Sequence, residues 1–242
     1  MSLLLHCGSK AVSRVDVMAV PLPVATNRWK PVSYNDALSF VEQSIEEHLK
    51  IKQIRSSFGL NKKGNQMFAE LTYDNGSDLG VAFGLRQSYN KSLSLGLAVG
   101  AKVFVCDNLC FSGDSFTVLR RNTKNVWQDF QSLVIAQVQV AMESHGAMTA
   151  AIATMREQDC SLDEGYKLLG LAQGYDVLTP HQASVAFGDW TTPRHEEFGA
   201  RTLWSLYNAV TEGLKYGGPA TVLDRHCIAH KFFVSQLTQL AN

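Results

Sequence analysis

The first third of the chain contains a change of hydrophobic period. Behind Ser33, a residue type that caps helix N-termini, apolar residues recur at helical spacing from Leu38 to Leu49. Later, apolar residues occupy every second position of 67–73 and of 79–85. The sequence therefore predicts an amphipathic helix at 34–50 followed by β-strands.

Two turn sequences divide these strands. Asn75-Gly76 separates the two alternating segments and is typical of a hairpin. The Asn-Lys-Lys-Gly sequence at 61–64 places another strand, 51–58, before the first of them. We expect a three-stranded antiparallel meander behind one helix, with further strands within 92–121.

From residue 126 the period is helical. Phe130, Val134 and Val138 lie on one stripe of a long helix, and shorter helices are expected at 162–172, 180–187, 198–214 and 222–240. Strands first and helices later indicate an α+β fold. We expect one domain over 1–242, with a helix-plus-sheet region (1–125) and a helical region (126–242).

One predicted strand has an almost bare face. Opposite its apolar positions at 79–85 lie Gly80, Ala82, Gly84 and Arg86. Small residues in a strand allow close approach of another group. That group is either a ligand or a helix of the same chain.

Composition narrows the class of protein. The chain has 242 residues, is 45% hydrophobic, and carries 22 basic and 22 acidic side chains, which argues against a disordered chain or a wholly basic coat protein. The charge is unevenly distributed, since residues 50–125 contain 11 basic and 5 acidic side chains. The short N-terminal leucine run and the odd count of five cysteines favour a cytoplasmic protein with reduced thiols and no membrane span.

No complete catalytic or cofactor motif is present, and we expect neither a cofactor nor a metal. Phosphate-binding glycine loops are absent, and the Gly-Asp-Ser-Phe sequence at 113–116 lacks the partner that a serine hydrolase needs. His226 and His230 are four residues apart beside Cys227, but spacing supplies no third metal ligand. Cys106 and Cys110 do not form a zinc-knuckle pair.

A basic and polar cluster follows the bare strand face. Arginine and lysine suit phosphate contacts, hydroxyl groups supply neutral hydrogen bonds, and Tyr89 or Phe68 offers a ring for stacking. The candidate nucleic-acid-binding residues are Arg86, Ser88, Tyr89, Lys91, Lys102, Arg120, Arg121 and Lys124. An exposed sheet edge can carry the same residue types simply to resist aggregation.

The segment from Gly84 to Asp114 resembles a phage- and plasmid-associated family known as domain-of-unknown-function family 932. Segments near His6, through Tyr34 and from His195 to Lys215 are also similar to the family, so the resemblance covers nearly the whole chain. It implies a mobile-element setting and no established activity. By analogy of fold alone, a helix, a meander and a long helix are similar to the core of single-strand annealing proteins.

These observations leave three hypotheses. The first is a non-enzymatic protein that binds single-stranded nucleic acid, such as a single-strand annealing-like DNA-binding protein, in an oligomer. The second is a protein-interaction or anti-defence factor that binds a host or phage protein. The third is an enzyme whose site joins distant residues, with Asp107, Asn108 and His195 as candidates.

Overall fold

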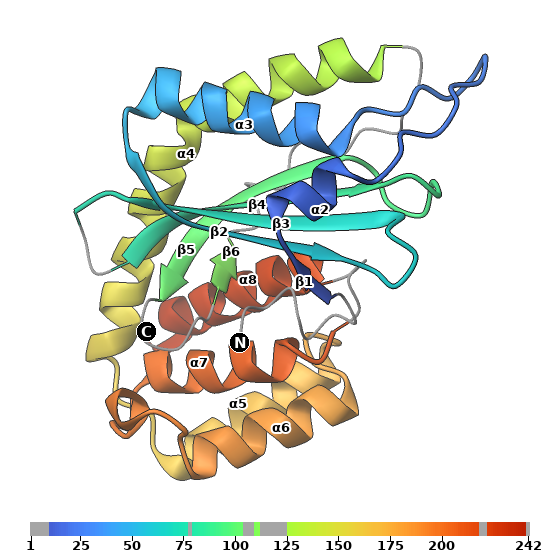
Figure 1. Ribbon diagram of the computed structural model, residues 1–242. Coiled ribbons are helices and arrows are strands. Elements are labelled where there is room, and N and C mark those ends of the chain that lie inside the picture. The colour runs from blue at the N-terminus through green and yellow to red at the C-terminus, as the bar shows by residue number, and fades with distance from the viewer. Residues whose placement is uncertain (1–9, 77–78, 104–108, 112–124, 218–221, 241–242) are drawn as a thin grey trace.

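The computed structural model describes residues 10–76, 79–103, 109–111, 125–217 and 222–240 (Figure 1). Within them an antiparallel sheet is preceded by helices α2 (Arg14–Met18) and α3 (Tyr34–Leu49) and followed by the long helix α4 (Val126–Glu157). Four further α-helices follow α4 within the described residues, which confirms the predicted α+β class.

The sheet is a meander whose strands pair antiparallel in the order of the sequence. Its strands are β1 (Lys10–Val12), β2 (Lys52–Leu60), β3 (Gln66–Asp74), β4 (Leu79–Ser88), β5 (Gly96–Val103) and β6 (Leu109–Phe111). The predicted turn at 61–64 joins β2 to β3, where Gly64 has a φ of +68°. Glycine adopts this left-handed conformation without steric cost.

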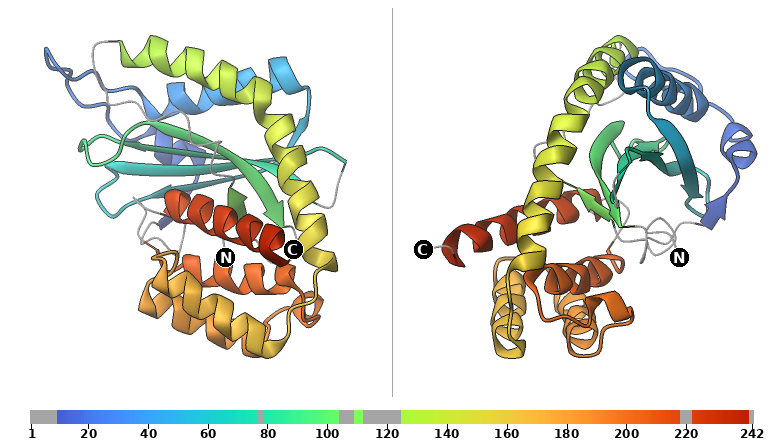
Figure 2. Two further views of the ribbon diagram at one scale, coloured as in Figure 1. Left: turned by 180° about the vertical axis from the view of Figure 1, so that it is seen from behind. Right: turned by 90° about the vertical axis from the view of Figure 1, so that its left-hand side faces the viewer.

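Two layers of helix enclose the sheet (Figure 2). On one face, α3 and the first half of α4 pack their predicted stripes against strand residues such as Val81 and Phe83, which are fully buried. The second half of α4 continues past the sheet into a separate helical core. One continuous helix therefore contributes to both cores.

The helical core contains α5 (Leu162–Gly174), α6 (Pro180–Thr191) and α7 (Leu203–Leu214). Ser161 and Thr179 each form a capping box at the start of α5 and α6. Every residue of α7 is buried, so this helix lies at the centre of the bundle. The sequence predicts this helix at 198–214, but α7 begins only at Leu203, and a separate 3-10 turn, Glu196–Phe198, precedes it.

The last helix, α8 (Val222–Leu240), lies across the face of the sheet opposite α3 (Figure 1). It packs near β6, and its Asp224 forms an ion pair with Arg86 at 3.6 Å. All ten residues of β4 are buried. Of the two explanations offered for the bare strand face, packing within the same chain is therefore the one observed.

None of the helices in the described part of the chain is long and apolar enough to cross a membrane.

Candidate functional site

Three connections meet at one end of the sheet (Figures 1 and 2). They are the link between α2 and α3, the β2–β3 turn and the β4–β5 turn. Antiparallel pairing brings the two turns to the same end. The third connection follows β1 and α2 and leads into α3, at the same end.

Side-chain amides lock the two turns together. Asn61 Nδ2 donates to Asn65 Oδ1 at 2.7 Å, and Asn90 Nδ2 donates to the same oxygen at 3.3 Å. Gln66 Nε2 also donates to Ser92 Oγ at 2.7 Å. These bonds fix the relative positions of the β2–β3 and β4–β5 turns, so the side chains at the tips of both turns start from fixed backbone positions.

A tyrosine pair attaches the start of α3 to the two turns. The Tyr34 and Tyr89 rings stack with centroids 3.8 Å apart, and the Tyr34 backbone N–H donates to Tyr89 Oη at 2.9 Å. Tyr34 Oη donates in turn to the Gly64 carbonyl at 3.4 Å. Burial raises the pKa of both phenols, so they stay neutral at physiological pH and serve as packing and hydrogen-bonding groups.

The outer surface of these connections is basic. Its cations are exposed side chains on the three connections, namely Arg28, Lys30, Lys62, Lys63 and Lys91. Asp36, in the first turn of α3, contributes a nearby negative charge that raises the pKa of Tyr89. Five cations on one end of the sheet favour binding of an anionic polymer. We call these five residues the loop-end basic cluster.

Trp29 lies within this cluster. Its backbone N–H donates to Thr26 Oγ1 at 3.1 Å, and its carbonyl accepts from the Thr26 N–H at 2.9 Å. Lys91 Nζ lies 4.9 Å from the centre of its ring. Trp29 as a whole is partly exposed. An aromatic face and several cations are thus combined at one place.

Three of the predicted nucleic-acid-binding residues lie in the interior instead. Arg86 is 6% exposed, Ser88 1% and Tyr89 9%. Arg86 pairs with Asp224 of α8, the Ser88 hydroxyl donates to the Leu93 carbonyl at 3.0 Å, and Tyr89 stacks on Tyr34. The prediction that these residues form an exposed phosphate-binding surface does not fit their placement. Phe68, the other ring proposed for stacking, is buried as well.

The other predicted contacts have different outcomes. Lys91 is exposed and belongs to the loop-end basic cluster. Lys102 is in β5, paired in register with Gly80. Arg120, Arg121 and Lys124 lie outside the described residues.

The histidine pair on α8 lies in the interior. His226 is fully buried, and His230 Nδ1 lies 3.4 Å from Tyr207 Oη. Within the described residues, no three His, Cys, Asp or Glu side chains are grouped so that they would hold a metal ion. Cys106 lies outside the described part, and the structure gives no account of the Cys110 side chain.

The residues proposed for an enzyme are not brought together by the described structure. Asp107, Asn108 and the 113–116 sequence fall outside it. His195 packs edge-on against Phe198, with ring centroids 6.0 Å apart. The hypothesis of a site assembled around Asp107 stays a prediction.

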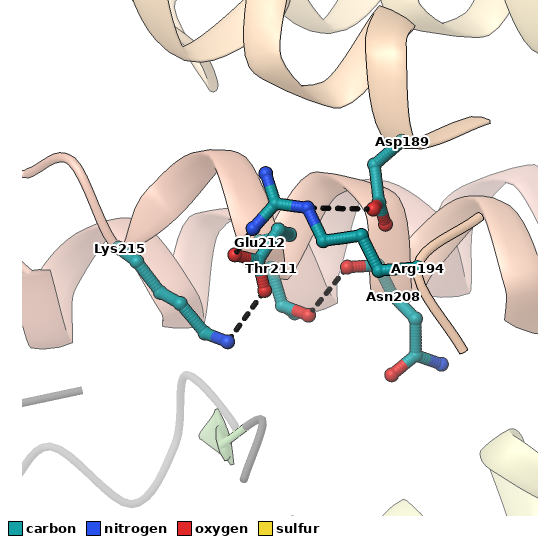
Figure 3. A network of polar contacts seen from close by, with 6 residues as sticks. All are labelled: Asp189, Arg194, Asn208, Thr211, Glu212 and Lys215. Carbon is teal, nitrogen blue, oxygen red and sulfur yellow. Dashed lines mark hydrogen bonds and ion pairs between the residues drawn. The ribbon is translucent and has the colours of Figure 1, made fainter. Parts of the chain in front are cut away.

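A polar network near His195 has no counterpart in the sequence analysis (Figure 3). Arg194 lies 3.3 Å from Asp189 Oδ1 and 2.5 Å from Glu212 Oε1, and Lys215 Nζ donates to Glu212 Oε2 at 2.5 Å. Burial raises the pKa of Asp189, while the charge of Arg194 lowers it. This network joins α6 to α7. Its two carboxylates are matched by two cations, so it has no excess charge for a ligand.

No protein-family model matches the chain, and comparisons with curated proteins and with solved structures give no match. The resemblance to the phage- and plasmid-associated family therefore stays a prediction.

Sequence reasoning missed most of the loop-end basic cluster. Lys62 and Lys63 were visible as part of a predicted turn, and their exposure follows from that assignment. Arg28, Trp29 and Lys30 are consecutive, yet nothing in the local pattern places them beside Lys91, about sixty residues later. Only the folded chain brings them together.

Proposed function

We propose that this protein binds single-stranded nucleic acid at the loop end of its sheet. The observation that carries the proposal is the convergence of the loop-end basic cluster and the partly exposed Trp29 on three interlocked connections. Lysine and arginine neutralise phosphates, and an aromatic ring accepts an unstacked base. Arg86 and Ser88 are buried and make no direct contact with the strand in this proposal.

Several features favour a single strand over a duplex. The start of α3 is anchored to the turns, because Tyr34 bonds to Tyr89 and to the Gly64 carbonyl. The cations lie on turns, beside neutral amide and hydroxyl groups such as Asn90 and Ser92. This combination contacts a backbone and unpaired bases without entering a groove. Binding is expected to tolerate many sequences.

Salt dependence tests the proposal. In a fluorescence-anisotropy titration with a labelled oligothymidylate, the slope of log affinity against log salt reports phosphate contacts. Replacing Lys62 and Lys63 with serine should lower this slope by about 1.4, from about 0.7 per contact on a single strand. Both side chains are exposed on a turn, so folding should be unaffected.

A matched control removes the same charge elsewhere. Lys52 lies at the opposite end of β2, and Lys167 lies on α5; both are exposed. The Lys52→Ser/Lys167→Ser variant should keep the wild-type slope. Equal slopes for the two double variants would contradict the proposed location, and an absence of salt-sensitive binding by the wild type would contradict the function.

A second candidate is binding of a protein partner. Four apolar side chains on α2 and the segment after it are strongly exposed: Val15 is 73% exposed, Met18 56%, Leu22 51% and Val24 87%. Exposed apolar side chains grouped in this way favour a protein contact. If the wild-type protein fails to bind oligothymidylate at any salt concentration, this candidate becomes the preferred one. Assembly into an oligomer and a mobile-element setting stay predictions.

A further inference from the structure

We infer that Trp29 is the stacking surface for one unpaired base, and that Lys91 covers this ring until a strand binds. The inference rests on the proposed function and specifies the ligand group that the site selects: a flat nucleobase, in addition to phosphate. It assigns separate roles to two neighbouring residues.

Trp29 differs from the other three tryptophans of the chain. Trp190 and Trp204 are 0% and 5% exposed, and Trp127 stacks on Phe130 with centroids 5.9 Å apart. Trp29 is partly exposed and belongs to neither hydrophobic core among the described residues. Its described ring contact is the ammonium group of Lys91. The ring is therefore not explained by core packing.

The segment that carries Trp29 is anchored on both sides. Thr26 closes the turn before it through two hydrogen bonds. After it, the Val32 carbonyl accepts from Gln87 Nε2 at 2.5 Å, and Tyr34 stacks on Tyr89. The backbone on both sides of Trp29 is thus held in place, while the residue itself is partly exposed. A pre-positioned ring loses little conformational freedom when a base stacks on it.

The turn that carries Lys91 fixes its backbone beside the Trp29 ring. Its φ is +64°, a left-handed conformation that non-glycine residues seldom adopt. The Asn90 carboxamide oxygen accepts from the Ser92 N–H at 3.1 Å and from its hydroxyl at 2.5 Å, which stabilises this conformation. The lysine side chain itself is long and exposed, so its ammonium group can leave the ring while the turn stays unchanged.

A base and the ammonium group compete for one face of the indole. The cation–π attraction of an exposed lysine is weaker than base–aromatic stacking. A base therefore displaces the ammonium group, and the phosphate of the same strand offers that group a new partner. The exchange makes affinity depend on bases as well as charge, which distinguishes a nucleic acid from other polyanions.

The experiment compares an oligothymidylate with heparin, a polyanion without bases. Tryptophan fluorescence of the full-length wild type should be quenched by the oligonucleotide and not by heparin. Trp29→Ala should lose the quenching and weaken oligonucleotide affinity by about 5- to 150-fold, the equivalent of one stacked base. Its heparin affinity should stay within about twofold of wild type. Trp29→Phe, which keeps an aromatic face, should restore most of the oligonucleotide affinity.

A second variant isolates the covering role of Lys91. Asparagine tolerates the left-handed conformation, so Lys91→Asn removes the charge and preserves the turn. This variant should lower the salt slope by about 0.7 and still show oligonucleotide quenching. Its intrinsic tryptophan fluorescence before ligand is added should differ from wild type, because the ammonium group no longer covers the ring.

Each outcome has a definite consequence. Undiminished oligonucleotide affinity in Trp29→Ala overturns the inference and reduces the proposed function to phosphate binding by the loop-end basic cluster. Equal loss of oligonucleotide and heparin affinity also overturns it, because Trp29 would then only hold the loop. Failure of the wild type to bind the oligothymidylate in a salt-sensitive way overturns the proposed function itself, whether or not heparin binds.

Discussion

At the scale of single residues, a glycine in α5 shows how closely the helical core is packed. A Cβ atom added to Gly165 would overlap the indole of Trp190. That ring cannot move easily, because it is fully buried, donates to the Leu162 carbonyl at 3.3 Å and is covered by the Arg201 guanidinium at 4.6 Å. The close approach of α5 and α6 therefore requires glycine here.

Substitution of this glycine gives a prediction with a clear sign. Gly165→Ala should lower the free energy of unfolding by about 1 to 3 kcal/mol, as overpacking does in other cores. A Cβ added to Gly170, on the same helix, would meet no atom within 4 Å, so Gly170→Ala should instead raise that free energy by about 0.5 to 1 kcal/mol. Urea unfolding followed by circular dichroism measures both. A stabilised Gly165→Ala protein would contradict the packing described for Trp190.

His145, on α4, is a buried titratable group. It is 3% exposed, and its Nδ1 lies 3.4 Å from Asn75 Nδ2. Burial lowers its pKa below the ordinary value of 6.5, mainly because the charged ring is costly to desolvate. The unfolded chain therefore binds a proton more readily than the folded protein. The stabilisation from neutral His145 is complete above pH 6.5 and is lost as the pH falls below it.

Glutamine at this position stays neutral across the same range. His145→Gln should therefore show a smaller loss of stability than wild type between about pH 7.5 and about pH 5.5. Urea unfolding at both pH values measures the two losses, and the difference between them isolates His145 from the other histidines. An identical loss in both proteins would mean that His145 keeps its ordinary pKa in the folded state.

At the scale of elements, the sequence predicts those helix limits that depend on residues within the helix itself. The final helix was predicted at 222–240 and spans those residues, and Ser33 caps α3 as its sequence indicated. Both assignments depend on periodicity and capping within one segment. In contrast, β1 and α2 have only three and five residues, too few to show a period. Strand β1 is defined by its pairing with β2, a contact distant in the sequence.

In the candidate site too, features set within one segment are predictable, and features set by distant segments are not. That Lys62 and Lys63 are exposed follows from a turn that the sequence identified. Arg86 is buried and forms an ion pair with Asp224 of α8, more than a hundred residues later in the chain. No pattern around residue 86 contains that information. Strand ends are therefore poor guides to exposure when the covering element comes late in the chain.

At the scale of the whole molecule, α4 couples two hydrophobic cores. Its first half contributes Phe130 and Val134 to the core beneath α3, and its second half contributes Met148 and Ile152 to the helical core. Leu79 and Ala101, which belong to the sheet, are also part of the helical core. These shared members favour one cooperative unit, in line with the single domain predicted from the sequence.

Gly146 lies in α4 between the two sets of core residues and tests this coupling. It is exposed, and a Cβ there would meet no atom within 4 Å. Gly146→Ala should raise the free energy of unfolding by about 0.5 to 1 kcal/mol through helix propensity alone. Hydrogen exchange with mass spectrometry across a urea series reports β3 and α7 separately. If the cores unfold together, both segments should shift to higher urea by the same amount. A shift confined to α7 would show that the helical core unfolds independently and that the chain contains two domains joined through α4.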